Sequence, residues 1–193
     1  MSVVGALILS IVTAVGGGTI RDLLLAPSQP AFWVTDPRYL SLCVASCVLA
    51  LLFLQDFPIS SRPLVLADAL SLGAFSVLGA RAALARRAPA LFAVLSGWLT
   101  ASGGGMVRDV LCYEAPRALG ASDKSMRAGP AVAGALVYVG LRRARYLRVG
   151  GGVGEEGALW LGMGVAVIMR LVADEWDIQE LAARTLHAIR FVP

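Results

Sequence analysis

The sequence predicts an all-α integral membrane protein with about six transmembrane helices. Of its 193 residues, 58% are hydrophobic and only 16% are charged, whereas a soluble domain is about 45–50% apolar and about 25% charged. The mean hydropathy is +0.74. In addition, the apolar residues gather into six stretches of nearly membrane-spanning length. This composition disfavours a disordered chain, a disulfide scaffold and most soluble enzymes.

The apolar stretches, in chain order, are residues 1–20, 39–55, 63–80, 88–107, 128–141 and 157–173. A transmembrane helix needs roughly 20 predominantly apolar residues, and the first four stretches meet this length. The fifth is short, but the arginines after it can extend toward the interface. The sixth spans if its one arginine is tolerated. We expect a single transmembrane domain over residues 1–175, with 157–173 as its last helix, and an amphipathic or flexible tail over residues 176–193.

A duplicated segment indicates an internal repeat. Residues 12–24, VTAVGGGTIRDLL, and residues 99–111, LTASGGGMVRDVL, are identical at eight of thirteen positions with a constant offset of 87. The copies lie in the first and fourth stretches, an odd number of three helices apart, so equivalent helices run in opposite directions if every stretch crosses the membrane. Such inverted-topology repeats are the ground plan of many transporters. We expect repeat one over residues 1–57 and repeat two over residues 62–145.

The same offset predicts that repeat one lacks a helix. It carries residues 39–55 onto 126–142, so the second and fifth stretches are equivalent. The third stretch begins repeat two, and its counterpart falls before residue 1. Either translation starts further upstream, or the chain has six helices. A chain with six helices is expected to leave one face of its first helix uncovered.

Two glycine triplets stand inside apolar stretches: Gly16, Gly17 and Gly18, and Gly103, Gly104 and Gly105. Each glycine within a helix costs about 1 kcal/mol relative to alanine. In lipid, a loosened backbone is tolerated only where protein or a water-filled cavity satisfies it. We interpret the triplets as places where two helices kink or break, so that bare backbone faces the interior or a pore. Close helix packing at small residues is the alternative interpretation.

Charged pairs follow the triplets. Arg21 and Asp22 in the first copy, and Arg108 and Asp109 in the second, are each followed by further apolar residues. Ionisable groups within a membrane usually face the bundle interior and mark ion or substrate paths. We therefore favour an interior role, with a pair at the membrane interface as the alternative.

Two further charges lie within apolar stretches, namely Asp68 and Arg170. They can anchor their helices at the interface, or they can pair with each other or with the Arg-Asp motifs. A lone buried charge is expensive in a membrane, which favours pairing.

Several functional classes lack the residues they need. The chain has one histidine, and Cys43, Cys47 and Cys112 form no CxxC pair. We therefore expect no metal site, no cofactor and no catalytic residues, and we expect the protein not to be an enzyme. No basic cluster alternates with aromatic residues, so we expect no nucleic-acid partner.

The doubled GGGxxRD motif, together with FWVTDPRYL (32–40), DALSLGAFSVLGA (68–80) and GGGMVRDVLCYEAP (103–116), resembles the prokaryotic-type trimeric intracellular cation (TRIC) channel family. The same sequence domain is catalogued as a glycine transporter domain. The resemblance covers roughly residues 3–175. It implies a homotrimer in which each protomer has its own pore for monovalent cations, chiefly K⁺. Members have seven helices, two inverted three-helix repeats and a last helix, so this chain departs in lacking the first.

Carried over by match, the two glycine triplets are the pore-helix kinks, and Arg21, Asp22, Arg108 and Asp109 belong to the pore and its supporting network. Arg170 falls where the last helix of the family carries an arginine. The resemblance therefore implies a potassium channel in the plasma (inner) membrane, surrounded by lipid.

Two alternatives stay open at the level of sequence. A secondary transporter of a small solute such as glycine uses inverted repeats and broken helices equally well. A membrane scaffold without transport is the other. We expect Gly17→Leu combined with Gly104→Leu to abolish transport in a channel or a transporter while sparing assembly.

Overall fold

A computed structural model of the chain describes residues 3–53, 62–116, 118, 128–146 and 154–175. In this part of the chain the helices are α1 (Val3–Leu25), α2 (Phe32–Thr35), α3 (Pro37–Phe53), α4 (Arg62–Ala85), α5 (Ala90–Leu111), α6 (Ala128–Tyr146) and α7 (Glu155–Glu175). The same residues contain no strand. The predicted all-α fold is confirmed. The tail expected over residues 176–193 lies outside the described residues.

Each predicted apolar stretch corresponds to one long helix. Four of them, α1, α4, α5 and α7, are long and apolar enough to cross a membrane. The apolar helix α3 is shorter, with 17 residues. Helix α6 has 19 residues, and arginines follow one another near its C-terminal end. The six spans expected from sequence are thus four helices that meet the length and apolarity of a span and two that are shorter or more charged.

Prolines mark where most helices begin. Pro37, Pro63 and Pro130 lie in the first turns of α3, α4 and α6, and Pro89 directly precedes α5. Proline is tolerated there because the first N–H groups of a helix have no partner within the helix. The short helix α2, which was not predicted, follows Pro30 in the same way. These prolines explain why the helices start close to the predicted positions.

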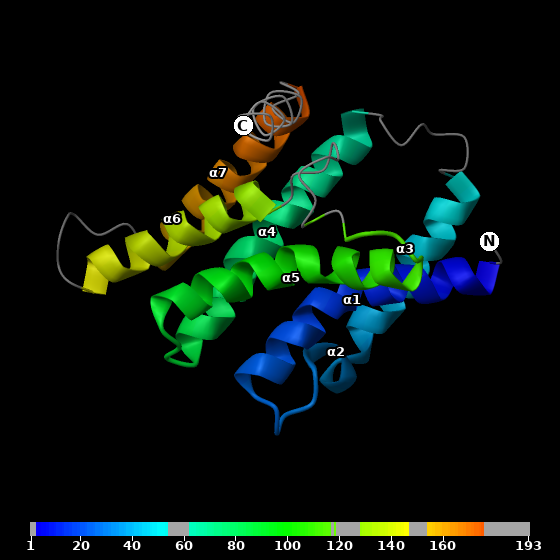
Figure 1. The fold of residues 1–193 in the computed structure, drawn as a ribbon, viewed down its shortest axis with the longest axis horizontal. Helices are drawn as coiled ribbons and strands as arrows, with labels where there is room; N and C mark the ends of the chain where they lie inside the picture. The colour runs from blue at the N-terminus through cyan, green and yellow to red at the C-terminus, as the bar shows by residue number, and fades with distance from the viewer. Residues whose placement is uncertain (1–2, 54–61, 117, 119–127, 147–153, 176–193) are drawn as a thin grey trace, which may run out of the picture.

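Helices α4, α5, α6 and α7 form the main packed body of the molecule. Figure 1 shows the axes of α4, α6 and α7 roughly aligned, with α7 running opposite to the other two, α5 at an angle to them and α1 beyond α5. The core among these helices consists largely of alanine and valine, with one fully buried aromatic residue, Tyr138. Glycines bring the axes close: an added Cβ on Gly134 would lie 2.8 Å from the carbonyl oxygen of Gly162, and the reverse distance is the same. Small residues at helix contacts are typical of membrane bundles.

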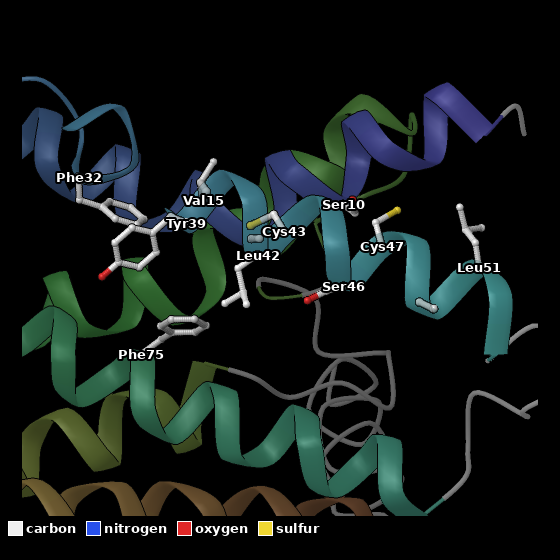
Figure 2. Close-up of a pocket in the computed structure, with 12 residues that line it drawn as sticks. Ser10, Val15, Phe32, Tyr39, Leu42, Cys43, Ser46, Cys47, Leu51 and Phe75 are labelled. Atoms are coloured by element: carbon white, nitrogen blue, oxygen red, sulfur yellow. The ribbon is translucent and has the colours of Figure 1, made fainter. Parts of the chain in front are cut away.

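An open groove runs along α1 and α3, which contact each other at its floor, and it faces α4. Figure 2 shows α3 side chains along it and Phe75 of α4 on the opposite wall. The groove encloses about 840 Å³ and is lined almost entirely by apolar side chains and small polar residues, among them Ser10 and Cys47. The offset of 87 places Ser10 on Gly97 and Cys47 on Gly134. In repeat two, those glycines are covered by Ser76 of α4.

By the same offset, the groove therefore lies at residues whose equivalents on α5 and α6 are covered by α4. This agrees with the sequence prediction that one face of the first helix is uncovered in this chain. Among the described residues, no helix fills this place.

Candidate functional site at the crossing of α1 and α5

The two glycine triplets meet where α1 crosses α5. An added Cβ on Gly16 would lie 3.2 Å from the Cα of Gly104, and one on Gly103 would lie 3.0 Å from the Cα of Gly17. A Cβ on Gly17 would overlap the carbonyl oxygen of Thr100. The two backbones touch directly, because no side chain stands between them. A side chain larger than hydrogen at the centre of the crossing would force the helices apart.

The contacts at the crossing occur in equivalent pairs. A Cβ on Gly104 would overlap the carbonyl oxygen of Thr13, just as Gly17 meets Thr100. The offset of 87 converts each of these contacts into the other. Because residue 13 lies opposite 104 and residue 17 opposite 100, α1 and α5 run antiparallel at the crossing. Two copies of one motif thus pack on each other in inverted orientation.

Both triplets lie within continuous helices. Helix α1 runs unbroken from Val3 to Leu25, and α5 from Ala90 to Leu111. A kink or a break was expected at each triplet; neither helix is broken there, and the kink stays a prediction. The partner backbone packs on each triplet and supports it. The contacts agree with the alternative interpretation of close packing at small residues. Bare backbone does face the interior, since Gly17, Gly18, Gly103 and Gly104 are buried.

The Arg-Asp pairs lie on opposite sides of the crossing and share one geometry. The Nε–H of Arg21 donates to Oδ1 of Asp22 over 2.9 Å, and that of Arg108 donates to Oδ1 of Asp109 over 3.0 Å. Nη2 of each arginine reaches the same oxygen, at 2.9 and 2.7 Å. Both aspartates are buried. Each pair is electrically neutral within the protein, which agrees with the interior position favoured from sequence.

Asp68 and Arg170 pair with each other, which is one of the two pairings expected from sequence. Nε of Arg170 lies 3.3 Å from Oδ2 of Asp68, and this ion pair joins α4 to α7. The side chain of Arg170 is 7% exposed and that of Asp68 is 27% exposed. The pair lies at the contact between α4 and α7, within the main packed body and away from the crossing of α1 and α5.

Sequence reasoning missed two threonines at the crossing. Thr13 Oγ1 donates to the carbonyl of Leu9 over 2.6 Å, and Thr100 Oγ1 donates to the carbonyl of Ser96 over 2.7 Å. These bonds are equivalent under the offset of 87 and turn both hydroxyls onto their own helices. The signal was present, because threonine is identical at this position in the two copies of the motif.

A polar cavity of about 380 Å³ lies beside the first Arg-Asp pair. It is lined by Arg21, Asp22, Phe32 and Arg86, with three residues of the loop and of α2. Helix α2 covers this end of α1, since the N–H of Phe32 donates to Oδ2 of Asp22 over 3.0 Å. No pattern in the sequence connects Phe32 with Asp22, because the contact joins residues on either side of a loop.

No group of three or more histidine, cysteine or acidic side chains lies together among the residues that the structure describes. Cys43 and Cys47 are free thiols on α3, and both line the groove between α1 and α3. The arrangement of this part of the chain offers helix backbone, hydroxyl groups and neutral ion pairs rather than a set of metal ligands.

Sequence comparisons connect this chain to a family of membrane proteins. A family model described as "Glycine transporter" matches residues 1–55 and 65–143. The chain is 35% identical over 176 residues to the UPF0126 inner membrane protein YadS of Escherichia coli K12, covering 91% of this chain and 80% of that protein. It is 33% identical over 181 residues to a UPF0126 membrane protein of Vibrio cholerae, covering 90% of this chain and 69% of the relative.

Solved structures with a similar fold are cation channels. One structure of TRIC cation channels superposes with a TM-score of 0.79 at 33% identity, over 92% of this chain and 82% of that chain. The TRIC trimeric intracellular cation channel orthologue from Rhodobacter sphaeroides superposes with a TM-score of 0.77 at 35% identity, over 92% of this chain and 86% of that chain.

Proposed function

The chain belongs to the family of TRIC channels and UPF0126 membrane proteins that the glycine-transporter model describes, and on this premise we propose that it is a cation channel. It is an integral membrane protein of the plasma (inner) membrane. Large apolar side chains on the outside of the helices, such as Leu91 at 74% and Trp160 at 70% exposure, suit contact with lipid. A channel of this kind carries out no covalent chemistry and is not an enzyme.

The permeant ions are monovalent cations, chiefly K⁺, and their path runs between α1 and α5 at the glycine triplets. The observation that carries this proposal is the contact of two inverted helices through bare backbone, with Gly16 against Gly104 and Gly103 against Gly17. Because no side chains interlock there, the helices can separate without breaking side-chain packing. Separation would bring backbone dipoles next to an ion, and such dipoles replace part of its hydration shell.

The Arg-Asp pairs suit a cation path because each guanidinium charge is cancelled by the adjacent carboxylate. Oδ1 of Asp109 accepts N–H groups from both Nε and Nη2 of Arg108. Oδ1 of Asp22 accepts the Nε–H of Arg21 and lies 2.9 Å from its Nη2. An unpaired arginine beside the path would repel cations, since charges interact strongly where water is scarce. We assign Arg21, Asp22, Arg108 and Asp109 to the support of the pore on these grounds.

The assembly proposed is a homotrimer with one pore in each protomer. Support comes from the R. sphaeroides neighbour, which is described as trimeric. The crossing of α1 and α5 lies within a single chain, which suits a separate pore in every subunit.

The test is single-channel recording of the purified protein in a planar bilayer under a KCl gradient. Unitary currents that reverse near the K⁺ equilibrium potential are expected. In a chain whose native cysteines are replaced by alanine, Thr13→Cys at the crossing should lose most of its current to a cationic methanethiosulfonate reagent. Leu49→Cys, on the outside of α3 at 55% exposure, is the control and should keep its current. Folded oligomers without current, or block of the control alone, would contradict the proposal.

A secondary transporter of a small solute such as glycine is the second candidate. The description of the matching family model favours it, and inverted helices suit alternating access. Uptake of labelled glycine into proteoliposomes separates the two candidates. A transporter gives saturable uptake driven by an ion gradient and no unitary currents, whereas the channel gives currents without concentrative glycine uptake.

A further inference from the structure

Helix α2 covers the first glycine triplet from outside the crossing. The ring of Phe32 lies against the backbone of Gly18 so closely that an added Cβ there would overlap the ring atom Cε1. The guanidinium carbon of Arg21 lies 5.6 Å from the centroid of the same ring, within the range of a cation–π interaction. One aromatic side chain therefore contacts both parts of the GGGxxRD motif.

Two hydrogen bonds fasten α2 to the same stripe of α1. The backbone N–H of Phe32 donates to Oδ2 of Asp22 over 3.0 Å, and the indole N–H of Trp33 donates to Oγ1 of Thr19 over 3.0 Å. The Thr19 hydroxyl in turn donates to the carbonyl of Val15 over 2.8 Å. All of these contacts hold the part of α1 that follows the centre of the crossing.

Helix α2 also connects this part of α1 to α3. The rings of Phe32 and Tyr39 meet edge to face, with centroids 4.9 Å apart and planes at 88°. Figure 2 shows the two rings side by side near the end of the groove between α1 and α3. The C-terminal half of α1 is thus held by α2 on one side and, through Phe32, by the start of α3.

The crossing is closed at the glycines in this structure. An added Cβ on Gly16 would lie 3.2 Å from the Cα of Gly104, and one on Gly103 would lie 3.0 Å from the Cα of Gly17. This spacing leaves no room for an ion between the helices at this level. Any opening that separates α1 from α5 at the triplet displaces the segment that Phe32 and Trp33 contact.

We propose that Phe32 and Trp33 are positioning residues that hold the C-terminal half of α1 in the closed crossing, so that α2 sets the ratio of closed to open channels. This inference rests on the channel function proposed above. The two residues lie on the outer side of α1 and do not line the α1–α5 contact. Weakening their contacts therefore changes how often the pore opens, while the current through one open pore stays the same.

The first test is a double-mutant cycle on the bond between Trp33 and Thr19. Trp33→Phe removes the donor, and Thr19→Val removes the acceptor at similar volume. Each change should raise the ratio of open to closed time about fivefold, which equals about 1 kcal/mol, the net value of one hydrogen bond. The double variant should match either single variant, because both remove the same bond. Trp160→Phe, at an exposed tryptophan of α7, is the matched control and should change nothing.

The second test removes the ring that covers Gly18. Phe32→Ala should raise the open probability more than Trp33→Phe does, because it deletes the contacts with Gly18, Arg21 and Tyr39 together. Unitary conductance should equal that of the unchanged protein. Phe53→Ala, at a phenylalanine of α3 that is 69% exposed, is the matched control. Reduced conductance with unchanged open probability would overturn the proposal.

A measurement without current keeps this inference separate from the channel function. Hydrogen exchange of the segment 26–36 in lipid nanodiscs should rise in Thr19→Val and in Phe32→Ala, because Asp22 no longer holds the Phe32 N–H as firmly. If the unchanged protein carries no current but hydrogen exchange rises in the two variants, the channel function fails, while the proposal that α2 holds α1 in place stands. If exchange and open probability in the variants both equal those of the unchanged protein, the proposal that Phe32 and Trp33 hold α1 is wrong.

Discussion

Helices α1 and α5 carry the same motif and make the same contacts with each other, yet their surroundings differ. In the most apolar stretch of α1, 17% of the residues are buried, against 44% in α5. Helices α4 and α6 cover α5, whereas in the described residues α1 has α3, the short α2 and an open groove. The contrast teaches that the geometry of the crossing comes from the motif itself and not from equal coverage of the two helices.

The largest expected effect tests whether the crossing is symmetric. Gly17→Leu and Gly104→Leu should each destabilise the protein by more than about 3 kcal/mol, because overpacking already costs about 1–3 kcal/mol and here the obstacle is a backbone carbonyl. Thermal unfolding followed by size-exclusion chromatography in detergent measures the loss. Gly140→Leu on α6 is the control, since a Cβ there meets nothing within 4 Å.

This prediction corrects one expectation from sequence, namely that leucine at both glycines would spare assembly. The close approach of Thr13 and Thr100 leaves no space for a side chain at either glycine. If one of the two leucine variants folds as well as the unchanged protein, the crossing is not symmetric in solution.

The next effect sharpens the difference in surroundings. Asp22→Asn should cost about 2–3 kcal/mol and Asp109→Asn about 1–2 kcal/mol, because removing one partner leaves an uncompensated arginine, at a cost that falls with exposure. The side chain of Arg21 is 13% exposed and that of Arg108 is 31% exposed, so Arg108 reaches water more easily. The shift in thermal midpoint at fixed detergent concentration measures both. Equal losses would mean that the local coverage of the two pairs does not matter.

A smaller effect concerns the contact between α4 and α7, outside the crossing. Asp68→Asn should cost about 1–2 kcal/mol, since it leaves the buried Arg170 with a weaker partner. Arg81→Ala is the control: its ion pair with Glu155 is half exposed and should contribute less than about 1 kcal/mol. The thermal midpoint and the unitary conductance should be measured together. A change in conductance from Asp68→Asn would place this pair closer to the ion path than its position between α4 and α7 indicates.

The smallest effect compares one equivalent position in the two helices. The offset of 87 places Val15 on Ser102, and both are buried. The hydroxyl of Ser102 has no hydrogen-bond partner among the residues that the structure describes. Ser102→Ala should therefore stabilise the protein by about 0.5–1 kcal/mol, and Val15→Ser should destabilise it by about 1–2 kcal/mol. A loss of stability in Ser102→Ala would indicate that water reaches this hydroxyl at the crossing.

Much of the architecture could be predicted from local pattern. The apolar stretches predicted the long helices, and the duplicated motif identified the two helices that pack in opposite directions. The ends of α1 and α5 were placed too early, before Arg21 and Arg108. A charged residue normally ends a membrane span, but these arginines are neutralised by the next residue within the same helix.

The sequence by itself determined that the chain lies in a membrane, that two of its helices carry copies of one motif, and that each copy has a glycine triplet at the same position. Composition and repeats can be read directly from the order of the residues, without knowing which residues meet in space. Only the tertiary structure decided that the triplets pack on Thr13 and Thr100 in unbroken helices. It also decided that Asp68 forms an ion pair with Arg170 and that Phe32 covers Gly18. These contacts join residues far apart in the chain. Their energies depend on which surfaces meet, and the meeting of surfaces is fixed only when all the helices pack together.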